Sequence, residues 1–267
     1  MNGRPAHRLA AAGVAVGSLL LLGLLVLPVS ALVLRGGAAG FRQLGTDAEL
    51  RASLLLTAST ATLATLVAVV LGTPIAWLLA RGRMPAAALV GALLDLPLLI
   101  PHPVAGIALL LAFGRASPLG GALDRAGIAL LGSPLAIGLA MLFVAAPLYV
   151  SAAREAIARV DARYESVART LGDSAWRAAW RVTRPLAGRG LVAAAVVMWA
   201  RAASEFGAIV ILTYNPKVAS VLSYDRFNAF GLDAALPVAA VLVLLAVIPL
   251  LVLRSLRVRA ALGEPAR

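Results

Sequence analysis

The sequence contains no cysteine, and other residues with reactive side chains are scarce. Without cysteine, the 267-residue chain has no disulfide, no thiolate nucleophile and no sulfur ligand for a metal. Its one lysine, Lys217, follows a proline and not a glycine-rich turn, which excludes a P-loop for ATP. The two histidines, His7 and His102, form no HExxH metal motif and no convincing Ser-His-Asp set. We therefore expect no catalytic residue, metal or cofactor in this chain.

Charged and aromatic residues are also few. Only 13% of the residues are charged and 5% are aromatic, whereas 61% are hydrophobic and the mean hydropathy is +0.94. A soluble core of this size does not need so many apolar residues, so the composition predicts an all-α, polytopic integral membrane protein. The net charge of +12 is compatible with nucleic-acid binding. However, no stacking aromatics alternate with the basic residues in a soluble fold, and we expect no nucleic-acid partner.

The apolar runs predict about six membrane spans in one transmembrane domain, 1–267. The predicted spans are 9–34, 50–80, 86–113, 134–152, 190–213 and 236–253. The first run resembles a signal peptide, but it is longer than the apolar region of one, so we interpret it as a retained span. Threonines and alanines in 50–80 allow close helix approach, which places this span inside the bundle.

The distribution of arginine predicts the orientation in the membrane. About six spans put both termini on one side, together with the turn 81–85 and the polar loop 153–189. Most of the basic residues lie on this side. Because basic loops stay in the cytoplasm, we expect a multi-pass protein of the plasma or inner membrane with both termini cytoplasmic.

The polar loop 153–189 predicts two short helices joined by a tight turn. In the first helix, apolar residues such as Tyr164 and Leu171 are expected on one face and Glu165 on the opposite face. Gly172 ends this helix, and Asp173 or Ser174 caps the next one. Trp176 and Trp180 give the second helix an aromatic stripe, and Pro185 is expected to stop it. Trp and Arg also suit a loop that lies on lipid headgroups, which is the alternative interpretation.

The pattern Glu165-x-x-Ala168-x-x-x-Gly172, with Pro185 about a dozen residues on, resembles the cytoplasmic "EAA" loop of permease subunits in ABC importers. In that family a short helix of the loop sits in a groove of the ATP-hydrolysing subunit. The consensus has alanine at both positions after the glutamate, where this chain has Ser166 and Val167. The resemblance implies a coupling loop that comprises Glu165, Ala168, Leu171, Gly172, Trp176 and Pro185.

Charged residues within the predicted spans indicate a functional path. Arg201 and Glu205 lie four apart and share a helix face, so they either line a conduit or only neutralise each other within the bundle. The third predicted span carries Asp95 and His102, and its three prolines predict a broken helix. A lone histidine is more often a satisfied interior residue than a ligand, but its broken-helix setting favours the path. The expected path or gate comprises Asp95, Pro101, His102, Arg201, Ser204 and Glu205.

The segments 199–208, 214–217 and 100–108 resemble permeases for molybdate and tungstate, and sulfate permeases more distantly. The resemblance implies a type I ABC importer permease fold and import of a tetrahedral oxyanion. It also implies that an extracytoplasmic binding protein selects the ion and that two ABC ATPase subunits bind ATP and Mg²⁺, so this chain is not an enzyme. A homodimer is expected from size too, because about six spans are too few to enclose a path. The remaining partner is membrane lipid.

Three alternatives stay open at this point. The first is a sulfate-type ABC permease. The second is an ion-gradient-driven secondary transporter with Glu205 and Asp95 as proton carriers, which leaves the Trp/Arg loop unexplained. The third is a membrane enzyme that uses His102 or Asp95, for which no second catalytic partner lies at a recognisable spacing.

Overall fold

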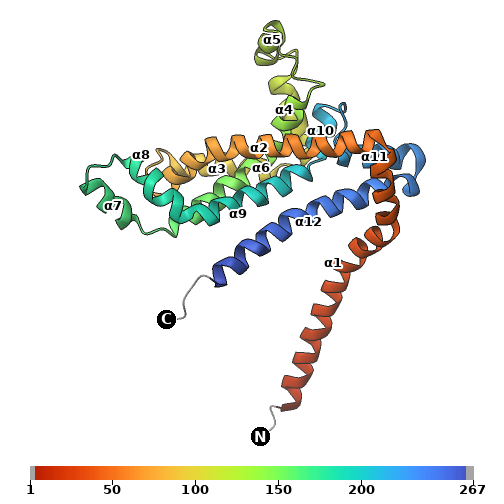
Figure 1. The fold of residues 1–267 in the computed structure, drawn as a ribbon, viewed down its shortest axis with the longest axis horizontal. Coiled ribbons are helices and arrows are strands. Elements are labelled where there is room, and N and C mark those ends of the chain that lie inside the picture. Colours follow the sequence, from red (N-terminus) through yellow and green to blue (C-terminus); the bar gives the residue numbers. More distant parts are fainter. Residues whose placement is uncertain (1–3, 263–267) are drawn as a thin grey trace.

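The computed structural model describes residues 4–262, and side chains for residues 13–249 and 251–254. Every regular element in this part of the chain is a helix, as the sequence predicts (Figure 1). Arg267, expected in the cytoplasmic tail, lies outside the described residues. The elements are α1 Arg4–Thr46, α2 Ala48–Ala80, α3 Ala87–Leu99, α4 His102–Phe113, α5 Pro118–Arg125, α6 Pro134–Ala158, α7 Ala162–Thr170, α8 Ala175–Ala178, the π-helical turn η1 Ala179–Thr183, α9 Arg184–Ala203, α10 Gly207–Leu212, α11 Ala219–Phe230 and α12 Leu232–Leu262.

Helices α2, α6 and α9 run side by side and form the core of the bundle (Figure 1). The buried face of α2 is made of small residues, among them Thr57, Ala61, Ala64 and Ala68. Such residues let helix backbones approach closely, and their hydroxyls bond across the contact. Thr57 Oγ1 accepts a hydrogen bond of 2.9 Å from the Ala219 amide at the start of α11. The sequence-based placement of this span inside the bundle therefore agrees with the structure.

Five helices in the described residues are long and apolar enough to cross a membrane, and there are six if a bent pair counts as one span. The pair is α3 and α4, which meet at 116°. Pro101 and Pro103 lie at this break, and neither has the amide hydrogen that a continuous helix requires. Helices α4 and α5 consequently project from the side of the bundle (Figure 1).

Several helices extend beyond the predicted spans. Helix α1 continues to Thr46, α6 continues to Ala158, and the segment predicted as a polar loop after residue 213 contains α11. Pro185 does not stop the second loop helix. It lies in the first turn of α9, and the π-helical turn before it lets the helical chain continue from Ala175 to Ala203. The wider π-helical turn accommodates Pro185, which has no backbone N–H to donate a hydrogen bond to the preceding turn.

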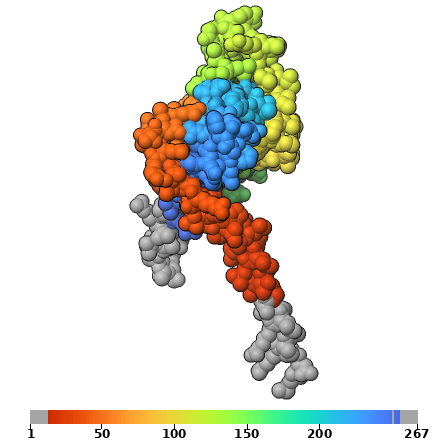
Figure 2. All heavy atoms as spheres, turned by 90° about the vertical axis from the view of Figure 1, so that its right-hand side faces the viewer, coloured from red at the N-terminus to blue at the C-terminus, as the bar shows by residue number. Residues whose placement is uncertain are grey.

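Helix α1 is the most peripheral element. Its C-terminal part contacts α12, whereas its residues 13–29 are almost all exposed and extend away from the bundle (Figures 1 and 2). The loop that carries α7 and α8 lies at one end of the bundle, and α10 and α11 lie at the other end (Figure 1). The two groups of predicted site residues are thus separated along the bundle axis.

Candidate functional site

The loop between α6 and α9 forms the first predicted short helix as α7, whereas the second, which begins as α8, continues through η1 into α9. Helix α7 is capped by Asp161, whose carboxylate accepts a hydrogen bond of 2.8 Å from the Arg163 amide. It ends before Gly172, where φ is +99°, a backbone region that glycine adopts without strain. Ser174 caps α8 by accepting a hydrogen bond from the Arg177 amide. The turn and its caps follow from local sequence alone.

Glu165 is the central contact of this loop. Its side chain is only 3% exposed, and one carboxylate oxygen, Oε1, accepts three hydrogen bonds. The donors are Arg81 Nε at 2.8 Å and Trp77 Nε1 at 3.1 Å, both near the end of α2, and the Thr183 hydroxyl in η1. We call these four residues the Glu165 clamp. The clamp fastens α7 to α2 and to the chain leading into α9.

The environment of Glu165 keeps its carboxyl ionised. Burial alone raises the pKa of this carboxyl, because it disfavours the charged form. The hydrogen bonds from Thr183, Arg81 and Trp77, together with the charge of Arg81, outweigh burial and lower the pKa below its ordinary value of 4.5. Glu165 is therefore an anion at neutral pH and holds Arg81, which is itself only 8% exposed.

The structure shows which face of α7 meets the bundle. The sequence predicts the apolar residues and Glu165 on opposite faces, without deciding which face packs. Glu165 is buried, while Tyr164, Val167 and Leu171 are 58%, 59% and 84% exposed. Helix periodicity identifies the two faces but not which one meets the bundle. An exposed apolar face of this kind marks a contact surface for another molecule.

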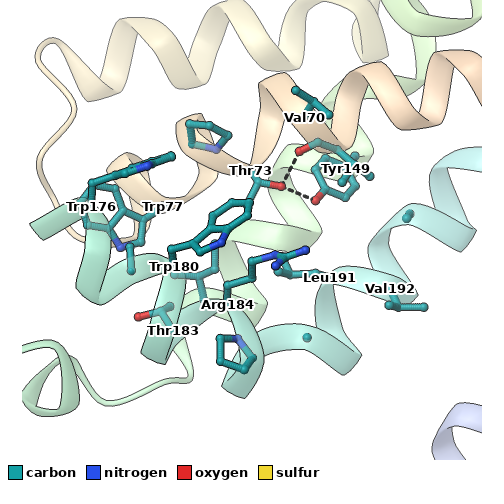
Figure 3. Close-up of a pocket in the computed structure, with 17 residues that line it drawn as sticks. Val70, Thr73, Trp77, Tyr149, Trp176, Trp180, Thr183, Arg184, Leu191 and Val192 are labelled. Carbon is teal, nitrogen blue, oxygen red and sulfur yellow. Dashed lines mark hydrogen bonds between the residues drawn. The ribbon is translucent and has the colours of Figure 1, made fainter. Parts of the chain in front are cut away.

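A column of aromatic and cationic side chains lies beside the clamp. The rings of Trp77 and Trp176 are 6.1 Å apart in an edge-to-face arrangement, and Trp176 stacks on Trp180 at 6.3 Å. The guanidinium of Arg83 lies 5.2 Å from the Trp77 ring, and that of Arg184 lies 4.2 Å from the Trp180 ring. Figure 3 shows the three tryptophans and Arg184 around one cavity. The sequence predicted the stripe of Trp176 and Trp180, but it did not predict that Trp77 of α2 packs against this stripe.

The second group of site residues lies where two spans are broken. One break separates α3 from α4 and carries His102, and the other separates α9 from α10 and carries Glu205. Arg201 Nη2 lies 2.8 Å from Glu205 Oε2 and 2.7 Å from His102 Nε2. The other oxygen of Glu205 accepts a hydrogen bond of 2.9 Å from the Ala208 amide, at the start of α10. We call His102, Arg201 and Glu205 the inter-span cluster.

Close packing of α4 on α10 brings this cluster together. A Cβ atom at Gly207 would lie 2.8 Å from the Cβ of His102 and 3.1 Å from Pro103 Cδ, so only glycine allows this approach. Glu205 is fully buried, whereas the side chains of His102 and Arg201 are 43% and 23% exposed. The carboxylate therefore lies behind the two nitrogen-bearing groups. Discontinuous helices that face each other across a cavity are typical of transport sites in membranes.

The exposed side of the cluster opens into a cavity of about 560 Å³. Four residues predicted for the path line it, namely Pro101, His102, Arg201 and Ser204. Glu205 contacts this group from behind, but Asp95 is exposed on α3 and does not line the cavity. The cavity thus presents a guanidinium, an imidazole and a hydroxyl, which are groups that suit an anion. Among the described residues, no three His, Asp or Glu side chains converge on a metal-ion position.

Sequence reasoning missed the partners of Glu165. Trp77 and Arg81 lie 88 and 84 residues before it, and no spacing rule connects positions so far apart. It also missed a polar network at the opposite end of the bundle. There Lys217 lies 2.5 Å from Asp225, and Arg226 lies 2.6 Å from Asp47. This network ties the segment after α10 to the start of α2.

Comparison with known proteins places these features in a family. Residues 72–260 match the family described as the binding-protein-dependent transport system inner membrane component. The chain is 42% identical over 197 residues to the molybdate/tungstate transport system permease protein WtpB of Thermococcus kodakarensis, covering 74% of each chain. It is 38% identical over 248 residues to a probable molybdenum ABC transporter permease protein of Haloferax volcanii, covering 90% of this chain and 89% of that one. In fold it resembles a chain in the crystal structure of a bacterial ABC transporter for alginate import, with a TM-score of 0.72, 15% identity and 98% of each chain covered.

Proposed function

Because this chain belongs to the family of binding-protein-dependent transport system inner membrane components, we propose that it is the membrane-spanning subunit of an ATP-driven importer of molybdate or tungstate. The observation that carries the proposal is the long match to permeases named for these ions, at 42% and 38% identity. Both ions are tetrahedral dianions of nearly the same size. The proposed substrate is therefore this class of oxyanion.

The inter-span cluster suits the passage of an anion. His102, Arg201 and Ser204 line a cavity and offer hydrogen-bond donors, whereas Glu205 neutralises part of the charge from behind. A fully cationic site would bind a dianion too strongly to release it, and transport requires contacts that are weak and transient. We infer that the Arg201–Glu205 pair keeps the path attractive to oxyanions without trapping them. High-affinity selection then belongs to an extracytoplasmic binding protein.

The loop between α6 and α9 suits the docking of an ATPase subunit. Its exposed surface is the apolar side of α7, with Val167 and Leu171, and no other described segment covers it. The Glu165 clamp fastens the opposite side to α2, so force applied to α7 passes into the bundle. The proposed complex has two copies of this chain, two ATPase subunits that bind ATP and Mg²⁺, and one binding protein. Both termini and this loop are then cytoplasmic, in agreement with the arginine distribution.

Reconstitution of defined complexes in liposomes tests the proposal. The chain, its ATPase partner and the oxyanion-binding protein should take up molybdate or tungstate only when ATP is supplied, with sulfate as the comparison ion. Omission of the ATPase should abolish uptake. Accumulation by this chain alone under a proton gradient would instead identify a secondary transporter. Uptake of sulfate in clear preference to both other ions would contradict the proposed substrate.

A further inference from the structure

A larger cavity, of about 730 Å³, lies between α2, α6 and α9 beside the Glu165 clamp (Figure 3). Its size falls within the ~300–1,000 Å³ that is usual for small-molecule sites. Its walls are mostly apolar, with aliphatic side chains such as Val70, Leu191 and Val192 on one side and three tryptophans on the other. It is distinct from the cavity at the inter-span cluster, with which it shares no lining residue.

The hydroxyl groups that line this cavity are satisfied within the protein. Thr73 and Tyr149 form a hydrogen bond of 2.6 Å with each other, and the Thr183 hydroxyl donates to Glu165. Arg184 is the only charged residue among those that line the cavity, and no acidic residue lines it. Among the described residues, Arg184 has no carboxylate within ion-pair distance and packs on the Trp180 ring. The cavity therefore complements a ligand with an apolar body and one anionic end.

The position of the cavity identifies the class of ligand. Arg184 begins α9 and lines the same cavity as Trp77 near the end of α2, so it lies where the apolar bundle meets the polar loop. Trp176 and Trp180 lie at the same boundary between the bundle and the loop, and each side chain is 52% exposed. Tryptophan and arginine at such a boundary are typical of the headgroup region, and basic pockets between membrane helices on the cytoplasmic side bind anionic headgroups.

We propose that this cavity binds an anionic phospholipid, with an acyl chain between α2 and α9 and the phosphate on Arg184. The geometry gives the lipid a structural role. Trp77 and Thr183 contribute to both the cavity wall and the Glu165 clamp, so an occupied cavity supports the anchor of α7. The inference uses the proposed orientation but not the identity of the transported ion.

Bromine quenching of tryptophan fluorescence tests this proposal on the full-length chain in lipid nanodiscs. Three of the four tryptophans line the cavity, and Trp199→Phe removes the other one. Phosphatidylglycerol with brominated acyl chains should quench this protein more strongly than brominated phosphatidylcholine at the same mole fraction. Arg184→Gln should reduce the preference for phosphatidylglycerol about tenfold, the contribution of a charge-assisted contact. Arg189→Gln is the matched control, because Arg189 lies on the same helix but not on the cavity wall.

A second variant fills the cavity. No heavy atom lies within 4 Å of a Cβ atom built at Gly188, which is part of the cavity wall, so Gly188→Leu should be accommodated and should block the ligand. Quenching by both lipids should fall in this variant. It should stay unchanged in Gly138→Leu, an equally open position on α6 that does not line the cavity.

Three results would overturn the proposal. The first is equal quenching by the two lipids, and the second is an Arg184→Gln variant that behaves like Arg189→Gln. The third is quenching of the monomer but not of the dimer, which would show that a second copy of the chain covers the cavity. Native mass spectrometry of the purified protein provides an independent readout, since retained phosphatidylglycerol should be lost with Arg184→Gln and kept with Arg189→Gln.

Discussion

Removal of the Glu165 carboxylate is expected to release α7 from the bundle. In Glu165→Ala, Arg81 stays buried without its ion-pair partner, and Trp77 and Thr183 lose their acceptor. Breaking one side of a buried ion pair costs about 3–5 kcal/mol. Glu165→Gln keeps an oxygen that accepts hydrogen bonds but loses the charge, so its cost should lie nearer the ~1.5–3 kcal/mol of a hydrogen bond to a charged group.

Amide hydrogen exchange of residues 162–183 in nanodiscs measures this release. At about tenfold per 1.4 kcal/mol, Glu165→Ala should reduce the protection of α7 by about 10²- to 4 × 10³-fold, and Glu165→Gln by about 10–10²-fold. Stimulation of ATP hydrolysis by the loaded binding protein should fall in the same order. Glu155→Ala is the control, because its partner Arg159 lies 3.8 Å away in an exposed pair that contributes little. If α7 protection and ATPase stimulation were the same in Glu165→Ala as in the wild type, the clamp would not transmit force.

Three further predictions concern pH, the inter-span cluster and the docking face. The ionised Glu165 carboxylate holds α7 in place, and because its pKa is lowered in the folded protein, this stabilisation is complete above about pH 4.5. The protection of the α7 amides against exchange should decline as the pH falls below that value through the folded pKa. Glu165→Gln should remove this pH dependence. Glu205→Ala should abolish oxyanion uptake with assembly intact, because Arg201 loses its buried partner; normal uptake would make Glu205 a packing residue only. Val167→Asp should weaken ATPase binding, measured by co-purification, by at least about tenfold, whereas Leu119→Asp, an exposed apolar position on α5, should leave it unchanged.

The sequence predicted features that depend on local or compositional signals. Hydropathy was sufficient for the all-helical membrane fold, and Gly172 and Ser174 were sufficient for the turn between α7 and α8. The prolines of the third predicted span indicated a break, although not its 116° angle. Pro185 misled because a π-helical turn lets the helical chain continue past a residue that otherwise ends a helix.

Features that depend on contacts between distant segments were not predictable from one sequence. The inward direction of Glu165 depends on Arg81 and Trp77, which approach it only after α2 and α9 have packed. The contact between His102 and Arg201 depends on the crossing of two separately broken spans. Asp95 depends on the same kind of contact. It shares a predicted span with His102, but the bend between α3 and α4 separates it from the cavity that His102 lines.

One continuous helical segment connects the two candidate sites. Residues Ala175–Ala203 form a 29-residue helical stretch, about 43 Å long at 1.5 Å per residue. It starts at Ala175, just after the turn at Gly172, and ends two residues before Glu205, so we expect a displacement of α8 along this axis to move Arg201 as well. Glu205 is four residues from Arg201 and is paired with it, whereas His102 belongs to a different span. We therefore expect the contact between Arg201 and His102 to change first when the loop moves, and the path to open between these two side chains.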